Sequence, residues 1–317
     1  MIYNFSSSAI DDLLAQAKLC DILNEPKSAS MYRTIASLLN EDAIKFALPD
    51  GGRLFESNKP FSPVDADLLH LPYPVIVLEY SMSDAHPITI HQEELGCLAP
   101  KRICLAMDDS AGDGITVIPI WFDENERKWA VSLSCVFIPR KQDHSPDSLS
   151  YPSDVEGKRS GLRIDIRPLI GEAWDRCVEA EGTQAAMRLG WLDAKDEVNN
   201  LLSFLLALSC TNVSSRNSED EKLLRKVNAK RISKGKRPIF SYKILEIMVP
   251  KEALAKRDSA EGEFSRRSPR VHLRRGHVRR LSDGKRVWVN ACVVGKKEEG
   301  IVHKDYKVTP VSTPVEN

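Results

Sequence analysis

The chain has 317 residues, of which 42% are hydrophobic, and its 45 lysines and arginines balance its 45 aspartates and glutamates. This length and apolar content exclude a wholly disordered chain, because they suffice for a substantial buried core. No stretch supplies the roughly 20 apolar residues that a membrane span requires, and the first residues lack a secretory signal, so we expect a cytoplasmic protein without a membrane partner.

The first 47 residues predict a pair of helices. Apolar side chains recur at helical spacing between residues 10 and 17, and Ser7 or Ser8 is placed to cap the start of this helix. Pro26 ends it. A second apolar stripe lies between residues 31 and 39 and stops before the turn sequence "LPDGGR".

Residues 72–139 change to short runs rich in β-branched and aromatic residues, such as "VIVLEY", "RICLAM", "ITVIPIWF" and "KWAVSLSCVFIP". Turn residues separate these runs, so we expect consecutive strands to pair antiparallel in one central sheet. Large apolar rings in such a sheet normally face the core. Three tryptophans are therefore expected to pack there: Trp121, Trp129 and Trp174.

Residues 140–161 are polar and interrupted by prolines, which predicts a long loop. Residues 171–190 and 193–210 predict two helices, and "VNNLLSFLLALSC" in the second is apolar nearly all round, as a buried helix is. Because helices and strands come in blocks, we predict an α+β fold. It has an N-terminal helical pair, a central antiparallel sheet packed on buried helices, and a C-terminal β-hairpin module with a basic face.

Charge is unevenly distributed along the chain. Residues 1–220 hold 34 acidic and 20 basic side chains, whereas residues 221–310 hold 10 acidic and 25 basic ones. We therefore divide the chain into an acidic α+β body at 1–215, a basic helix plus β module at 216–310, and a tail at 311–317. This segregation favours a phosphate-rich partner, although an acidic part that only neutralises the basic part would give the same totals.

The first basic segment is a helix that begins near residue 221 and ends in "NAKRISKGKRP". It carries Lys230, Arg231, Lys236 and Arg237. Cations at this position also suit the negative end of the helix dipole, so a ligand is not the only explanation for them. A strand, "IFSYKILEIMV", and a charged linker at 250–268 follow, and three further strands are predicted at 270–281, 286–294 and 301–308.

The dipeptide Asp-Gly at 283–284, between two apolar and basic runs, predicts a β-hairpin with a type I′ turn. A two-residue loop of this type pairs Arg279 with Trp288 and His277 with Asn290. Because side chains alternate between the faces of a strand, these four residues would share one face, opposite the valines.

The apolar residues of the first strand stay on one face only if an extra residue, a β-bulge, lies at Arg275-Gly276. With this bulge, His272 and Arg274 lie on the same outer face as His277 and Arg279. Arginine matches phosphate oxygens and guanine edges, an indole ring stacks on bases, and asparagine can bond a base edge or a sugar. A local contact of Trp288 under Arg279 is the alternative. The predicted nucleic-acid-binding residues are Lys230, Arg231, Lys236, Arg237, His272, Arg274, Arg275, Arg279, Trp288 and Asn290.

A second hypothesis is a metal-independent endoribonuclease. Such an enzyme needs a base for the 2′-hydroxyl, an acid for the leaving oxygen and a cation for the charged transition state. His277 and Tyr306, with His303 and Lys304 nearby in sequence, are the candidate catalytic residues. A third hypothesis is an inhibitor or adaptor that binds a host or phage protein.

No cofactor and no metal site is predicted. The sequence contains no phosphate-binding glycine loop and no nucleophile elbow. Its seven cysteines are scattered, with no closely spaced pair, which fits reduced thiols and disfavours zinc. Glu79 and the pair Asp108-Asp109 are expected to be solvated carboxylates, because no motif of a metal-dependent nuclease surrounds them.

The segments "KRISKGKRPIFSYKILEI", "SPRVHLRRGHVRRL", "KRVWVNACVVG" and "GIVHKDYKV" resemble a group of bacteriophage and prophage proteins of unknown function. The shared elements are R-R-G-H at 274–277, W-V at 288–289 and D-Y at 305–306. The resemblance covers roughly residues 200–308 and implies a phage or bacterial origin in the host cytosol. It transfers no catalytic role. We therefore expect a phage-type protein that binds RNA or single-stranded nucleic acid and acts in phage gene expression or phage–host conflict.

Overall fold

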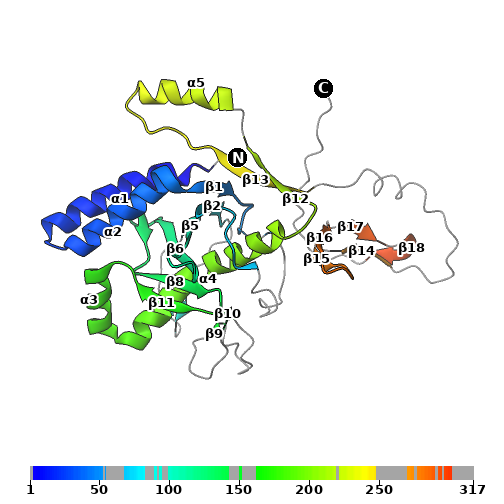
Figure 1. The fold of residues 1–317 in the computed structure, drawn as a ribbon, viewed down its shortest axis with the longest axis horizontal. Coiled ribbons are helices and arrows are strands. Elements are labelled where there is room, and N and C mark those ends of the chain that lie inside the picture. Colours follow the sequence, from blue (N-terminus) through cyan, green and yellow to red (C-terminus); the bar gives the residue numbers. More distant parts are fainter. Residues whose placement is uncertain are drawn as a thin grey trace.

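The computed structural model describes residues 3–52, 54, 68–82, 89–90, 93–94, 99–142, 150–151, 162–218, 221–247, 270–274, 277–289, 292–294 and 296–301. Helices α1 (Phe5–Ile22) and α2 (Pro26–Ser37) lie at one end of an elongated molecule, and the C-terminal strands lie at the other (Figure 1). A π-helical turn, Leu38–Asp42, follows α2. The α+β class and the N-terminal helical pair are confirmed.

A nine-stranded mixed sheet forms the centre of the molecule. In spatial order its strands are β11 (Asp165–Pro168), β8 (Ser134–Pro139), β6 (Gly114–Asp123), β5 (Lys101–Asp108), β2 (Val75–Ser81), β1 (Ile44–Ala47), β13 (Tyr242–Ile247) and β12 (Val213–Asn217), with β7 (Lys128–Val131) paired to β6.

The strands predicted between residues 72 and 139 pair antiparallel, as expected. The prediction of a wholly antiparallel sheet was wrong, because β1 runs parallel to both β2 and β13. Parallel neighbours cannot be joined by a tight turn: residues 48–74 separate β1 from β2, and residues 48–241, which include β2 and β12, separate β1 from β13.

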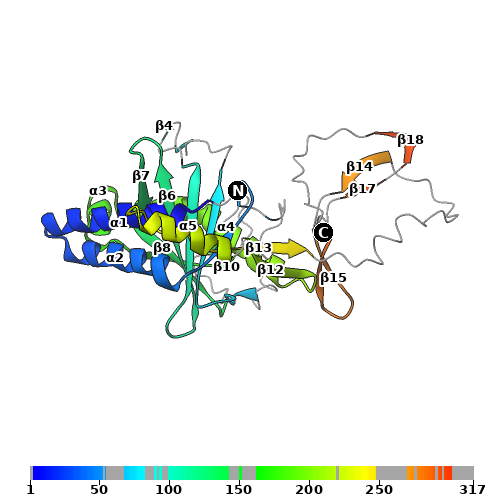
Figure 2. The same cartoon turned by 90° about the horizontal axis from the view of Figure 1, so that it is seen from above.

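Helices cover both faces of this sheet, as Figures 1 and 2 show. Helices α1 and α2 bury apolar side chains such as Ile10 and Leu13 against the face that carries Val77 and Ile103. Helix α4 (Thr183–Leu208) packs on the other face. Trp129 and Trp174 are buried as predicted, whereas Trp121 is only half-buried.

The two predicted helices at 171–210 divide at Gly182, earlier than expected. Helix α3 (Gly171–Glu181) ends there because Gly182 adopts a φ of 84°, which side chains disfavour. Gly190, inside α4, serves a different purpose. A Cβ on it would lie 2.1 Å from Ser134 Oγ, so glycine lets α4 approach β8 closely.

Strands β12 and β13 carry the central sheet across residue 215, where we place the end of the acidic body. Between them lies helix α5 (Glu221–Ile232), the predicted basic helix. The division of the chain into two domains at residue 215 stays a prediction. The sheet itself is continuous through this position.

The remaining strands are short. Two pairs lie within the body: β3 (Thr89–Ile90) with β4 (Glu93–Glu94), and β9 (Ser150–Tyr151) with β10 (Leu162–Arg163). At the C-terminal end, β14 (Arg270–Arg274) lies between β17 (Cys292–Val294) and β18 (Lys296–Ile301), and β15 (His277–Arg280) pairs with β16 (Arg286–Val289). The third predicted strand begins earlier than expected, because β18 starts at Lys296. Residues 302–308 lie outside the described part.

Candidate nucleic-acid interface

The predicted hairpin exists, but its turn has three residues and its register differs by one. Backbone N–H of Leu281 donates to O of Lys285 at 2.8 Å, and N–H of Gly284 donates to O of Leu281 at 3.0 Å. Gly284 has a φ of 80°, whereas Asp283 does not share the positive φ that a type I′ turn requires at both centres. A three-residue loop closed by a glycine is the next most common hairpin connection.

This register changes which side chains share a face. Arg279 lies opposite Val287, and Val278 lies opposite Trp288. The prediction that Arg279 and Trp288 share the outer face was therefore wrong: they project from opposite faces of the hairpin. His277 lies opposite Val289 and not opposite Asn290, which is outside the described residues.

The hairpin is docked on the turn that follows α4 (Thr183–Leu208) through backbone and amide contacts. Asn212 accepts from N–H of Trp288 at 2.8 Å and donates through its Nδ2 to O of Trp288 at 2.9 Å. Thr211 N–H donates to O of Arg286 at 2.9 Å. This amide clamp fixes the backbone of Trp288, and the indole itself is half-buried.

Other predicted residues of the hairpin module are placed only in part. His272 and Arg274 lie on β14, opposite Val294 and Cys292, and the structure gives their backbone alone. Arg275, like Asn290, lies outside the described residues, and so does the expected bulge at 275–276. The shared outer face of His272, Arg274 and Arg279 stays a prediction.

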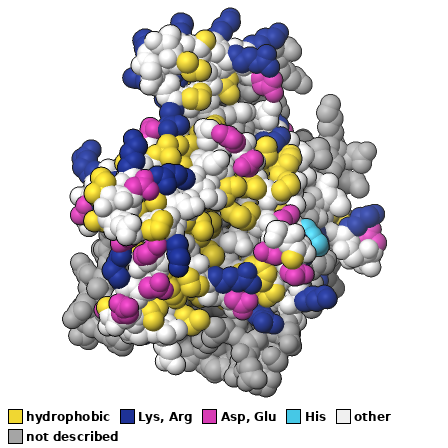
Figure 3. Space-filling model, turned by 60° about the vertical axis from the view of Figure 1, so that its left-hand side comes forward, with side chains coloured by type: hydrophobic (Ala, Val, Ile, Leu, Met, Phe, Trp, Pro, Cys, Tyr) yellow, Lys and Arg dark blue, Asp and Glu magenta, His cyan; other side chains and the backbone are white. Residues whose placement is uncertain are grey.

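Helix α5 supplies the other predicted cations and buries no residue. Its inner side touches the chain that follows it: Asn228 Nδ2 donates to O of Ile239 at 2.8 Å, and Arg231 Nε donates to O of Arg237 at 2.8 Å. Lys230 and Lys236 are exposed. Figure 3 shows lysines and arginines gathered at the top of the molecule, where α5 lies.

Arg237 is engaged by the body of the protein. Its Nε donates to the Asp11 carboxylate of α1. Two of the four predicted cations in this segment, Arg231 and Arg237, make side-chain contacts that hold the segment 231–237 in place. The other two, Lys230 and Lys236, are exposed and make no such contacts within the described part of the chain.

The candidate catalytic residues are not brought together in the described part of the chain. His277 is described by its backbone on β15, and Tyr306 lies outside the described residues, as do His303 and Lys304. The hypothesis of a metal-independent ribonuclease stays a prediction. Within the described ranges, no group of three or more His, Cys, Asp or Glu is arranged to hold a metal ion.

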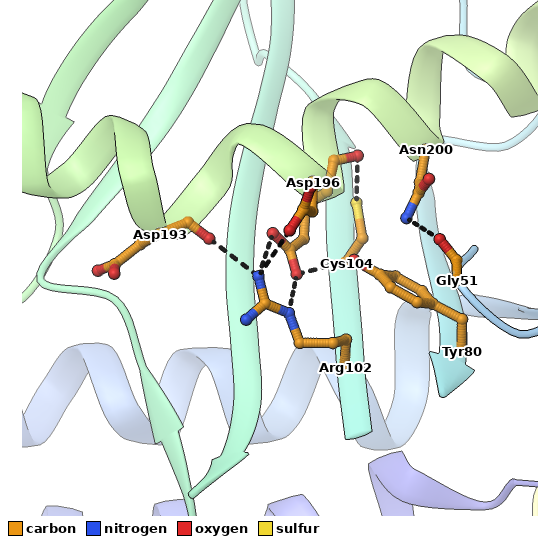
Figure 4. Close-up of polar contacts among 8 residues, drawn as sticks. Gly51, Tyr80, Arg102, Cys104, Asp193, Asp196 and Asn200 are labelled. Carbon is orange, nitrogen blue, oxygen red and sulfur yellow. Dashed lines mark hydrogen bonds and ion pairs between the residues drawn. The ribbon is translucent and has the colours of Figure 1, made fainter. Parts of the chain in front are cut away.

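A buried ion-pair network under α4 was not predicted. The Arg102 guanidinium, on β5, donates to the Glu197 carboxylate through Nε at 2.8 Å and Nη2 at 3.2 Å. Tyr80 donates its hydroxyl to the same carboxylate at 3.0 Å. Figure 4 shows Arg102 beside Asp193 and Asp196 of α4. The distance from Arg102 Nη2 to Asp196 Oδ2 is 3.9 Å.

Glu197 is fully buried. Burial alone would lower the pKa of Arg102, but Glu197, with Tyr80 and Asp196, outweighs it and holds that pKa above its ordinary value. The arginine therefore stays charged and joins α4 to the sheet. The signal in the sequence is a pair of charged residues directly before each of two largely apolar runs, in "KRICLAM" and "DEVNNLLSF", although neither segment identifies its partner.

Asp193 lies at the edge of this network and accepts from the Ser132 hydroxyl at 2.9 Å. Burial raises the pKa of Asp193 from 3.8 to about 6, against the opposing effects of Ser132 and Arg102. Its protonated form therefore favours folding below pH 4, and this stabilisation is lost as the pH rises to about 6.

Asp193→Asn should therefore raise the free energy of unfolding at pH 7.5 by about 1–2 kcal/mol and should give less gain at pH 4.5. Urea unfolding of the variant and the wild type at both pH values measures this. The exposed Asp113→Asn is the matched control, which changes one carboxylate outside the network. An equal gain for Asp193→Asn at both pH values would contradict the assignment.

A second buried carboxylate corrects the expectation for Glu79. It was expected to be solvated, but it is fully buried and accepts from N–H of Phe5 and Ser6 at 2.8 Å each. It also accepts from the Ser6 hydroxyl at 2.6 Å and the Tyr242 hydroxyl at 2.8 Å. Burial raises the pKa of Glu79, against these hydrogen bonds.

Glu79 thus replaces the predicted serine cap of the first helix. Helix α1 begins at Phe5, before Ser7 and Ser8, and its N-cap residue makes no side-chain cap bond. Nearby, burial lowers the pKa of Lys45 to about 8, against the opposing charge of Glu79. Asp108 is also partnered: it accepts from Arg140 Nη2 at 2.6 Å.

No protein-family model and no curated protein matches the chain. A structure entitled "Crystal structure of AcrVA2" is similar over 90% of this chain and 86% of that chain, with 13% sequence identity and a TM-score of 0.29. At this TM-score the likeness assigns neither a fold nor a function.

Over the described ranges, no helix combines the length and apolarity needed to cross a bilayer. The cysteines that the structure describes as free thiols are mostly buried, as predicted for reduced thiols: Cys20, Cys104, Cys135 and Cys210 are buried and Cys177 is half-buried.

Proposed function

We propose that this chain binds nucleic acid, RNA or another single strand, through two basic surfaces: helix α5 with its following loop, and the β15–β16 hairpin. One observation carries the proposal. Within the described residues, several exposed cations of these two elements have no carboxylate partner: Lys226, Lys230, Lys234, Lys236 and Arg279. Exposed lysine and arginine of this density favour a phosphate backbone.

The two surfaces lie at opposite ends of β12. The hairpin contacts residues 210–212 just before this strand, and α5 follows shortly after it. Five residues of extended strand cover about 17 Å. A ligand that contacts both surfaces must span at least this distance, which a single strand of several nucleotides does. The sequence carries no recognition-helix signature for the major groove, and the hairpin is a β surface, so we favour single strands over duplex DNA.

Fluorescence anisotropy with a labelled 20-nucleotide RNA, its DNA counterpart and a duplex tests the proposal over a salt series. Kd should rise steeply with salt. Lys230→Gln/Lys236→Gln should weaken single-strand binding roughly tenfold and reduce the slope of log K against log salt by about 1.4, since each lost contact removes about 0.7.

Lys18→Gln is the matched control, because Lys18 is an exposed cation on α1 that belongs to neither surface. Arg279→Gln tests the hairpin separately. Binding that is absent, indifferent to salt, or equally weakened by the control would refute the proposal. Incubating the RNA with the protein in EDTA tests the ribonuclease hypothesis, which predicts cleavage lost in His277→Ala.

A second candidate function, an adaptor that binds a protein, is favoured by exposed apolar side chains on α5. Leu223 is 60% exposed and Ile232 is 61% exposed, and phosphates do not explain either. Leu223→Ser/Ile232→Ser should abolish capture of a partner that persists after nuclease treatment of a bacterial lysate. The resemblance of residues 274–277 and 288–289 to phage proteins supports a role in phage gene expression or phage–host conflict.

A further inference from the structure

A groove on the acidic body lies between α1 and the strands β5, β6 and β7. It has about 440 Å³ of open volume, which is within the range of small-ligand pockets. Its walls combine three aromatic rings with two carboxylates and one ammonium group: Phe5, Phe122, Trp129, Asp11, Asp12 and Lys101.

The aromatic wall is continuous. The ring centroids of Phe5 and Trp129 are 5.6 Å apart, and those of Phe122 and Trp129 are also 5.6 Å apart in an edge-on arrangement. Trp129 is held in place, because its Nε1–H donates to Ser8 Oγ at 2.9 Å and its backbone N–H donates to Asp12 at 2.8 Å. The wall is therefore built before any ligand arrives.

Cations of the chain itself already bind at both ends of this groove. At one end, Lys101 Nζ lies 4.0 Å from the centroid of the Phe122 ring, a cation–π contact. At the other end, Asp11 pairs with the Arg237 guanidinium. An ammonium and a guanidinium thus show which chemistry each half of the groove accepts.

We propose that this groove is a binding site for an organic cation of the alkylammonium or alkylguanidinium class. The cation lies against Phe122 in the place that Lys101 Nζ now occupies, and Asp12 provides the opposite charge. Lys101 is displaced toward solvent, where its side chain is already 41% exposed and lies 3.9 Å from Glu124. This site takes a ligand of the opposite charge to that of the proposed nucleic-acid surface, and the Asp11–Arg237 pair joins the two.

Binding is measured on the full-length protein by the indole N–H signal of Trp129 in a ¹H–¹⁵N spectrum, because that group lies in the groove wall. The probe is Nα-acetylarginine amide, and the neutral Nα-acetylcitrulline amide is its matched control. We expect a saturable shift with a Kd of about 1–10 mM for the arginine derivative and none for the citrulline derivative.

Two variants test the geometry. Lys101→Met removes the competing ammonium and should tighten binding about threefold or more, a change that a merely structural role of Lys101 would not give. Phe122→Leu should weaken it by a similar factor, and the amide spectrum of each variant shows whether the fold is kept. If Phe122→Leu does not fold, Lys101→Met alone decides.

A third arm identifies the source of the cation. Equal affinity for Nα-acetylarginine amide and for the same side chain in a Gly-Arg-Gly peptide supports a small-molecule cation. Tenfold tighter binding of the peptide supports a side chain presented by a polypeptide. The proposal is overturned if no probe gives a saturable shift, if the citrulline derivative binds equally, or if Lys101→Met fails to tighten binding.

Discussion

Arg102→Met should lower the free energy of unfolding by about 3–5 kcal/mol, the largest loss that we expect from a single substitution in this chain. Methionine fills a similar volume, so packing changes little. The loss arises because Glu197, which is fully buried, keeps its carboxylate but loses the two hydrogen bonds at 2.8 and 3.2 Å that compensate it.

The double variant Arg102→Met/Glu197→Gln separates this effect from a loss of packing. Glutamine removes the uncompensated charge and still accepts from the Tyr80 hydroxyl, which now lies 3.0 Å from Glu197. It should therefore be more stable than Arg102→Met by about 2 kcal/mol. Urea unfolding followed by circular dichroism gives both values. If the double variant were no more stable than Arg102→Met, the buried charge would not be the cause.

Local patterns predicted the elements of this fold well where neighbouring residues determine them. The helical spacing between residues 10 and 17 and the β-branched runs "VIVLEY" and "ITVIPIWF" correspond to α1, β2 and β6. The parallel position of β1 between β2 and β13 was not predictable in the same way. It joins residues 44–47 to residues 242–247, and no local signal records so distant a pairing.

The buried carboxylate was missed for a related reason. Glu79 was judged as if β2 had a solvated face, but helices cover both faces of this part of the sheet, so the five inner residues of the strand are buried. In the candidate interface, the residue types were predictable from charge, whereas the register of the hairpin was not. One additional loop residue moves Trp288 to the face opposite Arg279.

Glu79→Gln should lower the free energy of unfolding by about 2–4 kcal/mol, because one carboxylate here accepts four hydrogen bonds. Glutamine has only one side-chain oxygen, and its NH₂ group takes the place of the other. This NH₂ group would then face a donor, either Phe5 N–H or the donors of Ser6 and Tyr242. The positive end of α1 also loses the negative charge that it favours.

Tyr242→Phe is the matched variant, since it removes one of these four bonds and leaves the carboxylate in place. It should cost about 1 kcal/mol, well below the loss in Glu79→Gln. Thermal and urea unfolding of both variants test this order. Equal losses would mean that Glu79 matters only through Tyr242. The expected order instead means that one side chain of β2 holds the start of α1 and the strand β13 together, and so joins the N-terminal helices to the segment that carries the basic helix α5.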